Sequence, residues 1–119
     1  MEENEMKDIE SRIQYKDKTY RIVFNINVME AIQAEYGSLE AWGAKMDGTN
    51  EPDAKAMRFG FAQMLNEGIE MDNEENGTDT PLLTLKQAGR IISEVGITET
   101  TAVLNRTINE STENDEKNA

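Results

Sequence analysis

The sequence predicts a small, mainly α-helical domain of four to five helices that begins with a β-hairpin. Three observations support this fold class. The strongest apolar period in the 119-residue chain is helical and lies in residues 52–71. Two short stretches of alternating apolar and polar residues lie near the start, separated by a polar turn. Capping patterns precede the other helical periods, so each helix has a recognisable beginning.

Residues 52–71 are predicted to form the central helix of the core. Pro52 suits its first turn, where a missing N–H needs no partner. Apolar residues then recur at steps of three and four and form one face: Ala54, Met57, Phe61, Met64, Leu65 and Ile69. Gly68 lies on the same inner side and lowers helix propensity. We therefore expect a second helix to pass close to it.

The hairpin is predicted from residues 11–15 and 19–24, which alternate on either side of a polar turn at residues 16–18. Ile13 and Tyr15 share one face of the first strand, and Tyr20, Ile22 and Phe24 share one face of the second. Two strands alone are marginally stable in water. The apolar face of the hairpin is therefore expected to rest on the helices.

Two further helices are predicted between the hairpin and the central helix. Asn27 and Glu30 have the spacing of a capping box, and Gly37 follows the last apolar position of that helix. Ser38 is expected to cap a short continuation over residues 39–46. That short helix contains Trp42, the single tryptophan of the chain.

Two helices are predicted in the last third of the chain. Thr84 and Gln87 form a second capping box for a helix that ends at Val95, before Gly96. Its core-facing residues are expected to be Leu85, Ala88, Ile91, Ile92 and Val95. The last helix is expected over residues 99–110, with Val103, Leu104 and Ile108 inside.

The predicted organisation is a flexible N-terminus at residues 1–10, a single domain at 11–110 and a disordered acidic tail at 111–119. A flexible acidic loop is expected at residues 72–80. It has a superficial likeness to a calcium-binding loop counted from Asp72, but its twelfth position is Leu83, where a bidentate acid is required. No metal site is therefore expected.

Charge and composition restrict the function classes. The net charge of −12, from 24 acids and 12 bases, repels nucleic acid and anionic lipid and favours basic or amphipathic polypeptides. The chain has no histidine and no cysteine. It also shows no catalytic constellation, so we expect neither enzyme activity nor a cofactor. No signal peptide or membrane-spanning run is apparent, which predicts a cytoplasmic protein.

Three residues are candidates for contacting a partner: Trp42, Arg58 and Phe59. Arg58 projects beside the apolar face of the central helix, and Phe59 projects nearly opposite its centre. Both have alternative explanations. Arg58 can cover the core with its stem and pair with an acid. Phe59 can pack beneath another segment, which would leave it no role in binding.

The order of these parts resembles the tail assembly chaperones of long-tailed phages and prophages. The resemblance rests on residues 23–32, 35–37, 58–68 and 83–92, the last reading LTLKQAGRII, within residues 12–108. It implies a chaperone that keeps the tape-measure protein soluble during tail assembly. Tail tube proteins are a further partner that it implies, and self-association stays open. The family is typically absent from the mature virion, and a longer frameshifted form often exists.

Two alternatives belong to a different class of function. The chain can be another acidic protein-interaction module of a phage or mobile element, including an inhibitor that mimics DNA. Mimicry requires carboxylates spaced like phosphates on one rigid face. Many acids here lie in predicted loops and tails, which argues against it.

Overall fold

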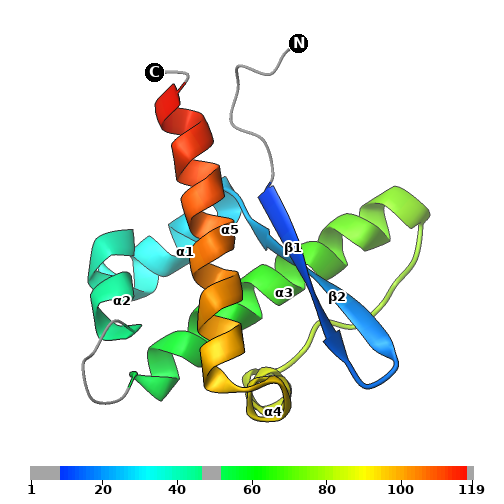
Figure 1. Cartoon of the computed structure of the whole chain (residues 1–119). Helices are drawn as coiled ribbons and strands as arrows, with labels where there is room; N and C mark the ends of the chain where they lie inside the picture. Colours follow the sequence, from blue (N-terminus) through cyan, green and yellow to red (C-terminus); the bar gives the residue numbers. More distant parts are fainter. Residues whose placement is uncertain (1–8, 47–51, 118–119) are drawn as a thin grey trace.

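The computed structural model describes residues 9–46 and 52–117, with side chains described at 11–46 and 52–110. Its elements follow one another as β1 (Ile9–Tyr15), β2 (Lys18–Phe24), α1 (Ile26–Tyr36), α2 (Leu39–Met46), α3 (Ala54–Asn76), α4 (Leu85–Val95) and α5 (Ile97–Lys117). The predicted class, a mainly helical domain with an N-terminal hairpin, is therefore confirmed. Figure 1 shows α3 passing behind the hairpin and behind α5, with α1 and α2 grouped to one side.

The hairpin is antiparallel and pairs Ser11 with Ile22 and Tyr15 with Lys18. Its turn is Lys16–Asp17, and Lys16 has a φ of 58°. Ile13, Ile22 and Phe24 lie in the core, as the alternation predicted. Val23 is also fully buried although it points to the opposite face. Both faces of the end of β2 are therefore covered, which the alternating pattern did not indicate.

A pair of hydroxyl groups joins the hairpin to the last helix. The oxygens of Ser11 and Thr107 lie 2.6 Å apart in the interior, and Thr107 donates to the carbonyl of Val103 at 2.8 Å. A threonine hydroxyl carries one proton. Because that proton goes to Val103, the Ser11 hydroxyl must donate to Thr107. Both buried hydroxyls are thereby satisfied, and β1 is fixed against α5.

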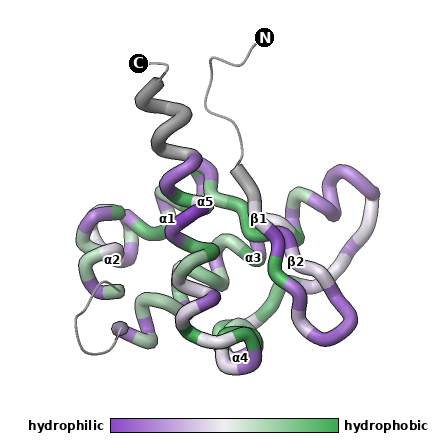
Figure 2. The backbone as a smooth tube through the Cα atoms, in the orientation of Figure 1, coloured by the Kyte–Doolittle hydropathy of each residue, from purple (hydrophilic) through white to green (hydrophobic). Residues whose placement is uncertain are grey.

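The central helix is longer and more deeply buried than predicted. Met57, Phe61, Met64, Leu65 and Ile69 of the expected face are buried. Ala54 of that face is exposed, whereas three small residues outside the predicted face are buried: Ala56, Gly60 and Ala62. Figure 2 shows hydrophobic positions along α3 where it meets the other elements, and hydrophilic positions at its far end and at the hairpin turn. The helix is thus covered on more than one side over its first half.

Gly68 is explained by a strand and not by a second helix. A Cβ atom there would lie 2.8 Å from the carbonyl oxygen of Arg21 on β2. Real Cβ atoms do not approach a backbone oxygen so closely. The prediction of a close approach was right, but its partner was wrong. Residue 68 is where α3 and β2 come into backbone contact.

Both ends of α3 differ from the prediction. Asp53 is the N-cap and accepts a hydrogen bond from the Ala56 N–H at 3.0 Å, so Pro52 precedes the helix instead of opening it. The helix continues to Asn76 and ends at Gly77, whose φ is 67°. Residues 72–76 are therefore helical, and the predicted acidic loop shrinks to the connection that follows them.

The start of α1 is also corrected. The N-cap is Asn25, whose side-chain oxygen accepts from the Val28 N–H at 3.2 Å. Asn27 lies inside the first turn, where its amide reaches Glu67 of α3. The predicted cap was therefore two residues late. Gly37 ends α1 with a φ of 93°, and Ser38 accepts from the Ala41 N–H at 3.0 Å to begin α2, both as predicted.

The last two helices follow their sequence signals closely. The Thr84–Gln87 capping box is complete, with both reciprocal hydrogen bonds formed. Ala88, Ile91 and Ile92 are buried as expected, but Leu85 is 45% exposed. In α5 the three predicted core residues are buried, and the helix extends from Ile97 to Lys117. Residues 111–117, predicted as a disordered tail, are helical; residues 1–8 and 118–119 lie outside the described residues.

Candidate functional site

Trp42, the first candidate contact residue, is a core residue. It is 2% exposed, and its indole N–H donates to the carbonyl oxygen of Ala56 at 2.8 Å. A Cβ at Gly60 would lie 2.2 Å from the Cζ2 of this ring, so the missing side chain at residue 60 makes room for the indole. In this conformation Trp42 fixes α2 to α3 and presents no surface to a partner.

Phe59 packs beneath another segment, which agrees with the alternative explanation given for it above. Its ring meets the ring of Tyr36 edge to face, with centroids 5.7 Å apart and planes inclined by 69°. The Phe59 side chain is half-buried against the core. Burial, followed by the nearby carboxylates of Asp53 and Glu35, raises the pKa of Tyr36 above its ordinary value. Phe59 thus helps to hold the end of α1 on α3.

Arg58 is the one candidate that reaches a surface cavity. Its stem lies over α4, where a Cβ at Gly89 would come within 3.2 Å of the arginine Cδ. This agrees with the predicted covering role of the stem. The predicted ion pair is not seen with any acid among the described residues. Arg58 lines two adjoining cavities, which we name the groove and the basic cup.

The groove has a volume of about 1270 Å³ and runs between the start of α3, the end of α4 and the start of α5. Met57, Ile92 and Val95 contribute its apolar wall, together with Ile97, which is 53% exposed. The basic cup has a volume of about 550 Å³. It is lined by Tyr15, Arg58, Lys86, Gly89, Arg90, Ser93 and Glu94.

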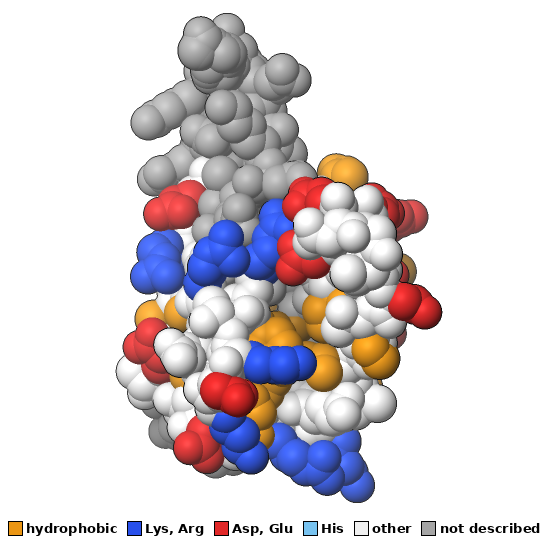
Figure 3. All heavy atoms as spheres, turned by 90° about the vertical axis from the view of Figure 1, so that its right-hand side faces the viewer, with side chains coloured by type: hydrophobic (Ala, Val, Ile, Leu, Met, Phe, Trp, Pro, Cys, Tyr) orange, Lys and Arg blue, Asp and Glu red, His pale blue; other side chains and the backbone are white. Residues whose placement is uncertain are grey.

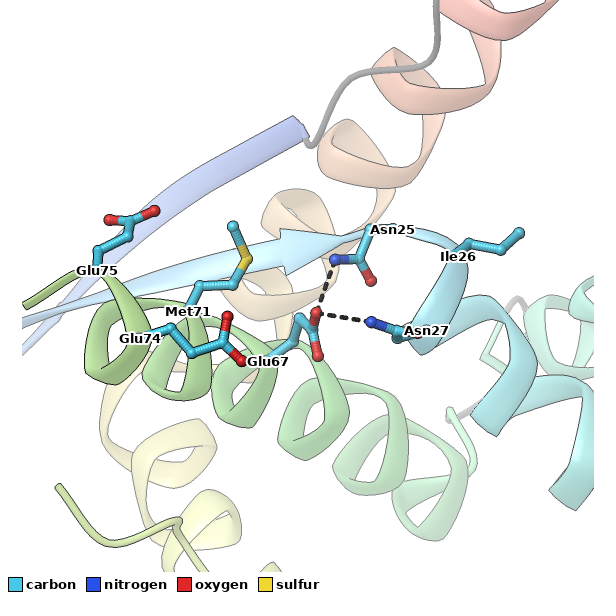
Figure 4. Close-up of a pocket in the computed structure, with 7 residues that line it drawn as sticks. All are labelled: Asn25, Ile26, Asn27, Glu67, Met71, Glu74 and Glu75. Carbon is cyan, nitrogen blue, oxygen red and sulfur yellow. Dashed lines mark hydrogen bonds between the residues drawn. The ribbon is translucent and has the colours of Figure 1, made fainter. Parts of the chain in front are cut away.

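A third cavity, the acidic cleft, lies between the start of α1 and the second half of α3. Its volume is about 410 Å³, and it is lined by Asn25, Ile26, Asn27, Glu67, Met71, Glu74 and Glu75. Figure 4 shows Glu67 facing the two asparagines, with Met71 and Glu74 beside it on α3. The same Glu67 oxygen accepts from the Asn25 amide at 2.8 Å and from the Asn27 amide at 3.2 Å.

The acidic cleft joins carboxylates to exposed apolar surface. Its lining holds three carboxylates and no basic side chain. Ile26 at its edge is 64% exposed, the highest value among the exposed large hydrophobic residues of the described chain. The site was not predicted from the sequence, because Asn27 was interpreted as a helix cap and Glu74 and Glu75 as part of a loop, and Ile26 was given no role. The signal that could have pointed to the site is an isoleucine, Ile26, between two asparagines at the start of a helix.

The opposite charges of the cleft and the cup show that the surface is not uniformly acidic. On the side of the molecule that carries the hairpin turn and the end of α3, hydrophobic side chains reach the surface between basic and acidic ones (Figure 3).

Among the described residues, no group of three or more potential metal-ligating side chains is arranged to hold an ion. Nor is any helix in the described part of the chain both long and apolar enough to cross a bilayer.

Comparisons with protein-family models, with curated proteins and with solved structures gave no match.

Proposed function

We propose that this chain is a binding protein for a basic, amphipathic helical segment, and that it acts as a tail assembly chaperone for the tape-measure protein. The observation that carries the proposal is the acidic cleft. Three carboxylates and no basic side chain line it beside exposed apolar surface; the guanidinium of Arg21, which is not part of the lining, lies 3.7 Å from the Glu75 carboxylate. Such a site suits a helix with lysine or arginine beside an apolar face.

The apolar part of the cleft supports binding as well as encounter. Ile26 and Met71 lie where the two helices approach, and Ile26 is largely open to solvent. Removing an exposed isoleucine from water on binding is favourable, and a methionine adapts its shape to different partners. The carboxylates then set the sign of the partner's charge, mainly through the rate of association.

The identity of the partner comes from the resemblance described above. A phage tail chaperone would hold a long helical protein soluble in the host cytoplasm until the tail is assembled around it. The excess of 24 acids over 12 bases fits a protein that shields such a partner. The DNA-mimic alternative is less well supported, because the surface also carries the basic cup, with three cations and one carboxylate in its lining.

The cleft is tested by titrating the full chain with a synthetic helical peptide that carries leucine on one face and lysine beside it. Glu74→Gln with Glu75→Gln should slow association several-fold and flatten its salt dependence. The control is Glu40→Gln with Glu110→Gln, which removes the same charge from exposed sites outside the cleft. Equal effects of the two pairs would show that only the net charge of the protein affects association. That result would overturn the proposal that the peptide binds in the cleft.

Ile26→Ser tests the apolar contribution separately. The change should weaken peptide binding by about 1–2 kcal/mol, mainly through faster dissociation. Stability should change little, since the side chain is mostly exposed. The specific role is tested by co-expression with the tape-measure protein of the same genome. If the wild-type chain binds the peptide but leaves the tape-measure protein insoluble, the general binding function survives and the chaperone assignment fails.

A further inference from the structure

Three basic side chains from two helices converge on the basic cup. Arg58 comes from α3, while Lys86 and Arg90 lie one turn apart on α4. The lining contains a single carboxylate, Glu94. In a chain with twice as many acids as bases, a local excess of two positive charges is a marked departure from the average surface.

None of these three cations forms an ion pair within the described part of the protein, although Glu94 offsets one of the three charges. No ion pair or hydrogen bond joins Arg58, Lys86 or Arg90 to a described acid. Arg21 behaves differently, since its guanidinium meets Asp72 at 2.5 Å. Like charges one turn apart on a helix repel each other. An anionic group placed in the cup would relieve this repulsion, which gives the cup a preference for negative charge.

The packing of α3 on α4 holds Arg58 at this position. Residue 89 is a glycine, and a Cβ there would approach the Arg58 Cδ to 3.2 Å. The Arg58 stem therefore lies against the backbone of α4 and is half-buried, while Lys86, three residues before Gly89, and Arg90, directly after it, line the same cavity. Ordering of an arginine stem before binding lowers the entropy lost when its guanidinium meets an anion.

The cup continues directly into the apolar groove. Arg58, Gly89 and Ser93 line both cavities. Beyond them the groove presents Val95 and the exposed Ile97 beside the largely buried Met57 and Ile92, and its other charged lining residues are Asp53, Lys55 and Glu99. An occupant that fills both cavities must therefore have apolar surface along its length and negative charge at one end. An amphipathic helix meets this requirement, because carboxylates near its C-terminus add to the negative end of its dipole.

We propose that the groove and the basic cup together bind an amphipathic helix of a partner protein, with its acidic end in the cup. This is a second site, opposite in charge preference to the acidic cleft and built from α3, α4 and α5. A peptide is favoured over nucleic acid, because a net charge of −12 repels a long polyanion more than a few carboxylates.

The test uses the full chain and a fluorescent helical peptide with leucine on one face and four glutamates at its C-terminal end. Lys86→Gln with Arg90→Gln should weaken binding about tenfold, since two contacts to charged groups are lost. Lys45→Gln with Arg106→Gln is the matched control, because both residues are exposed and lie outside the cup and groove. The control pair should stay within about twofold of wild type.

Four outcomes would overturn the proposal. Equal losses from both pairs of substitutions would show that only net charge is sensed. Unchanged affinity when the four glutamates become glutamine would show that the cup plays no part. Displacement of the acidic peptide by the lysine-bearing peptide would show that the two sites are one. A single-stranded oligonucleotide that binds more tightly than the peptide, and is lost with Lys86→Gln and Arg90→Gln, would reassign the cup to nucleic acid. Circular dichroism and the melting temperature establish that each variant is folded.

Discussion

The two halves of α3 are held in place by different forces. Residues 54–65 lie among apolar side chains, and the Trp42 ring fills the space above Gly60. In residues 66–76 the helix is bordered mostly by polar contacts: Arg21 with Asp72, Asn66 with the backbone of Leu83, and Asn73 with Thr78 and Thr80. The same helix thus packs on apolar side chains in its first half and forms mainly hydrogen bonds in its second half. The second half lines the acidic cleft, whereas the first half contributes Met57 and Arg58 to the groove.

The largest expected effect comes from truncating a buried ring in the first half of α3. Phe61 is fully buried, so Phe61→Ala should lower the free energy of unfolding by about 3–5 kcal/mol. Phe59 is half-buried on Tyr36, and Phe59→Ala should lower it by about 1–2 kcal/mol. Urea denaturation of both variants measures the two values. Equal losses would mean that Phe59 is as much a core residue as Phe61.

Adding one methyl group at Gly60 should have the next largest effect. Gly60→Ala brings a Cβ to 2.2 Å from the Trp42 ring, and the resulting strain should cost about 1–3 kcal/mol. The control is Gly43→Ala on α2, where a Cβ meets nothing within 4 Å. Higher helix propensity should make this control more stable by about 0.5–1 kcal/mol. If both variants gain stability, the tight contact between α2 and α3 is wrong.

In the polar half, single substitutions should have smaller effects. The Asn73 side-chain oxygen accepts from the Thr78 hydroxyl at 2.8 Å and from the Thr80 N–H at 3.0 Å, on the exposed surface. Asn73→Ala should be less stable than Asn105→Ala by about 0.5–1.5 kcal/mol. Both asparagines lie inside helices, so the gain in helix propensity cancels between them. Faster amide exchange at residues 73–80 in the first variant alone would locate the effect.

The smallest expected effect is that of calcium on the same polar half. Millimolar calcium should change the melting temperature by less than about 1 °C, since no bound state is stabilised. Asp72 is already paired with Arg21, and residues 72–76 continue the helix instead of folding around an ion. Magnesium at the same concentration controls for screening. A rise of several degrees with calcium alone would reveal a site in this segment.

The sequence predicted those elements whose signals are local. The Thr84–Gln87 capping box and the stops at Gly37 and Gly96 need only neighbouring residues, and each lies where predicted. The two hairpin strands were also predicted from neighbouring residues, but they begin at Ile9 and Lys18, two residues and one residue earlier than expected. Residues 72–76 were wrongly predicted as a loop, because the contacts that hold them in the helix come from elsewhere in the chain. Arg21 is 51 residues from Asp72, and no pattern in residues 72–76 announces it.

The candidate site was predicted less well for a related reason. Phe59 was selected because it falls off the apolar face of its helix, and Trp42 because it is the single tryptophan and lies on a short helix. Both face a neighbour that the sequence does not place. Gly60 accepts the indole, and Tyr36 covers Phe59. Arg58 was expected to project beside the apolar face of its helix. Its nearness to Lys86 and Arg90 could not be predicted, because it depends on how α3 packs against α4. Surface sites formed by two elements require the packing to be known.

The hydroxyl pair between β1 and α5 has a consequence for folding during synthesis. Ser11 and Thr107 are separated by 96 positions, so their contact cannot form until residue 107 has left the ribosome. Until then the hairpin face that α5 covers stays open on the nascent chain. Contacts of such long separation also slow folding, because a large loop must close before they form. The packing of this hairpin face is therefore completed late, by α5, which is translated after the elements that it covers.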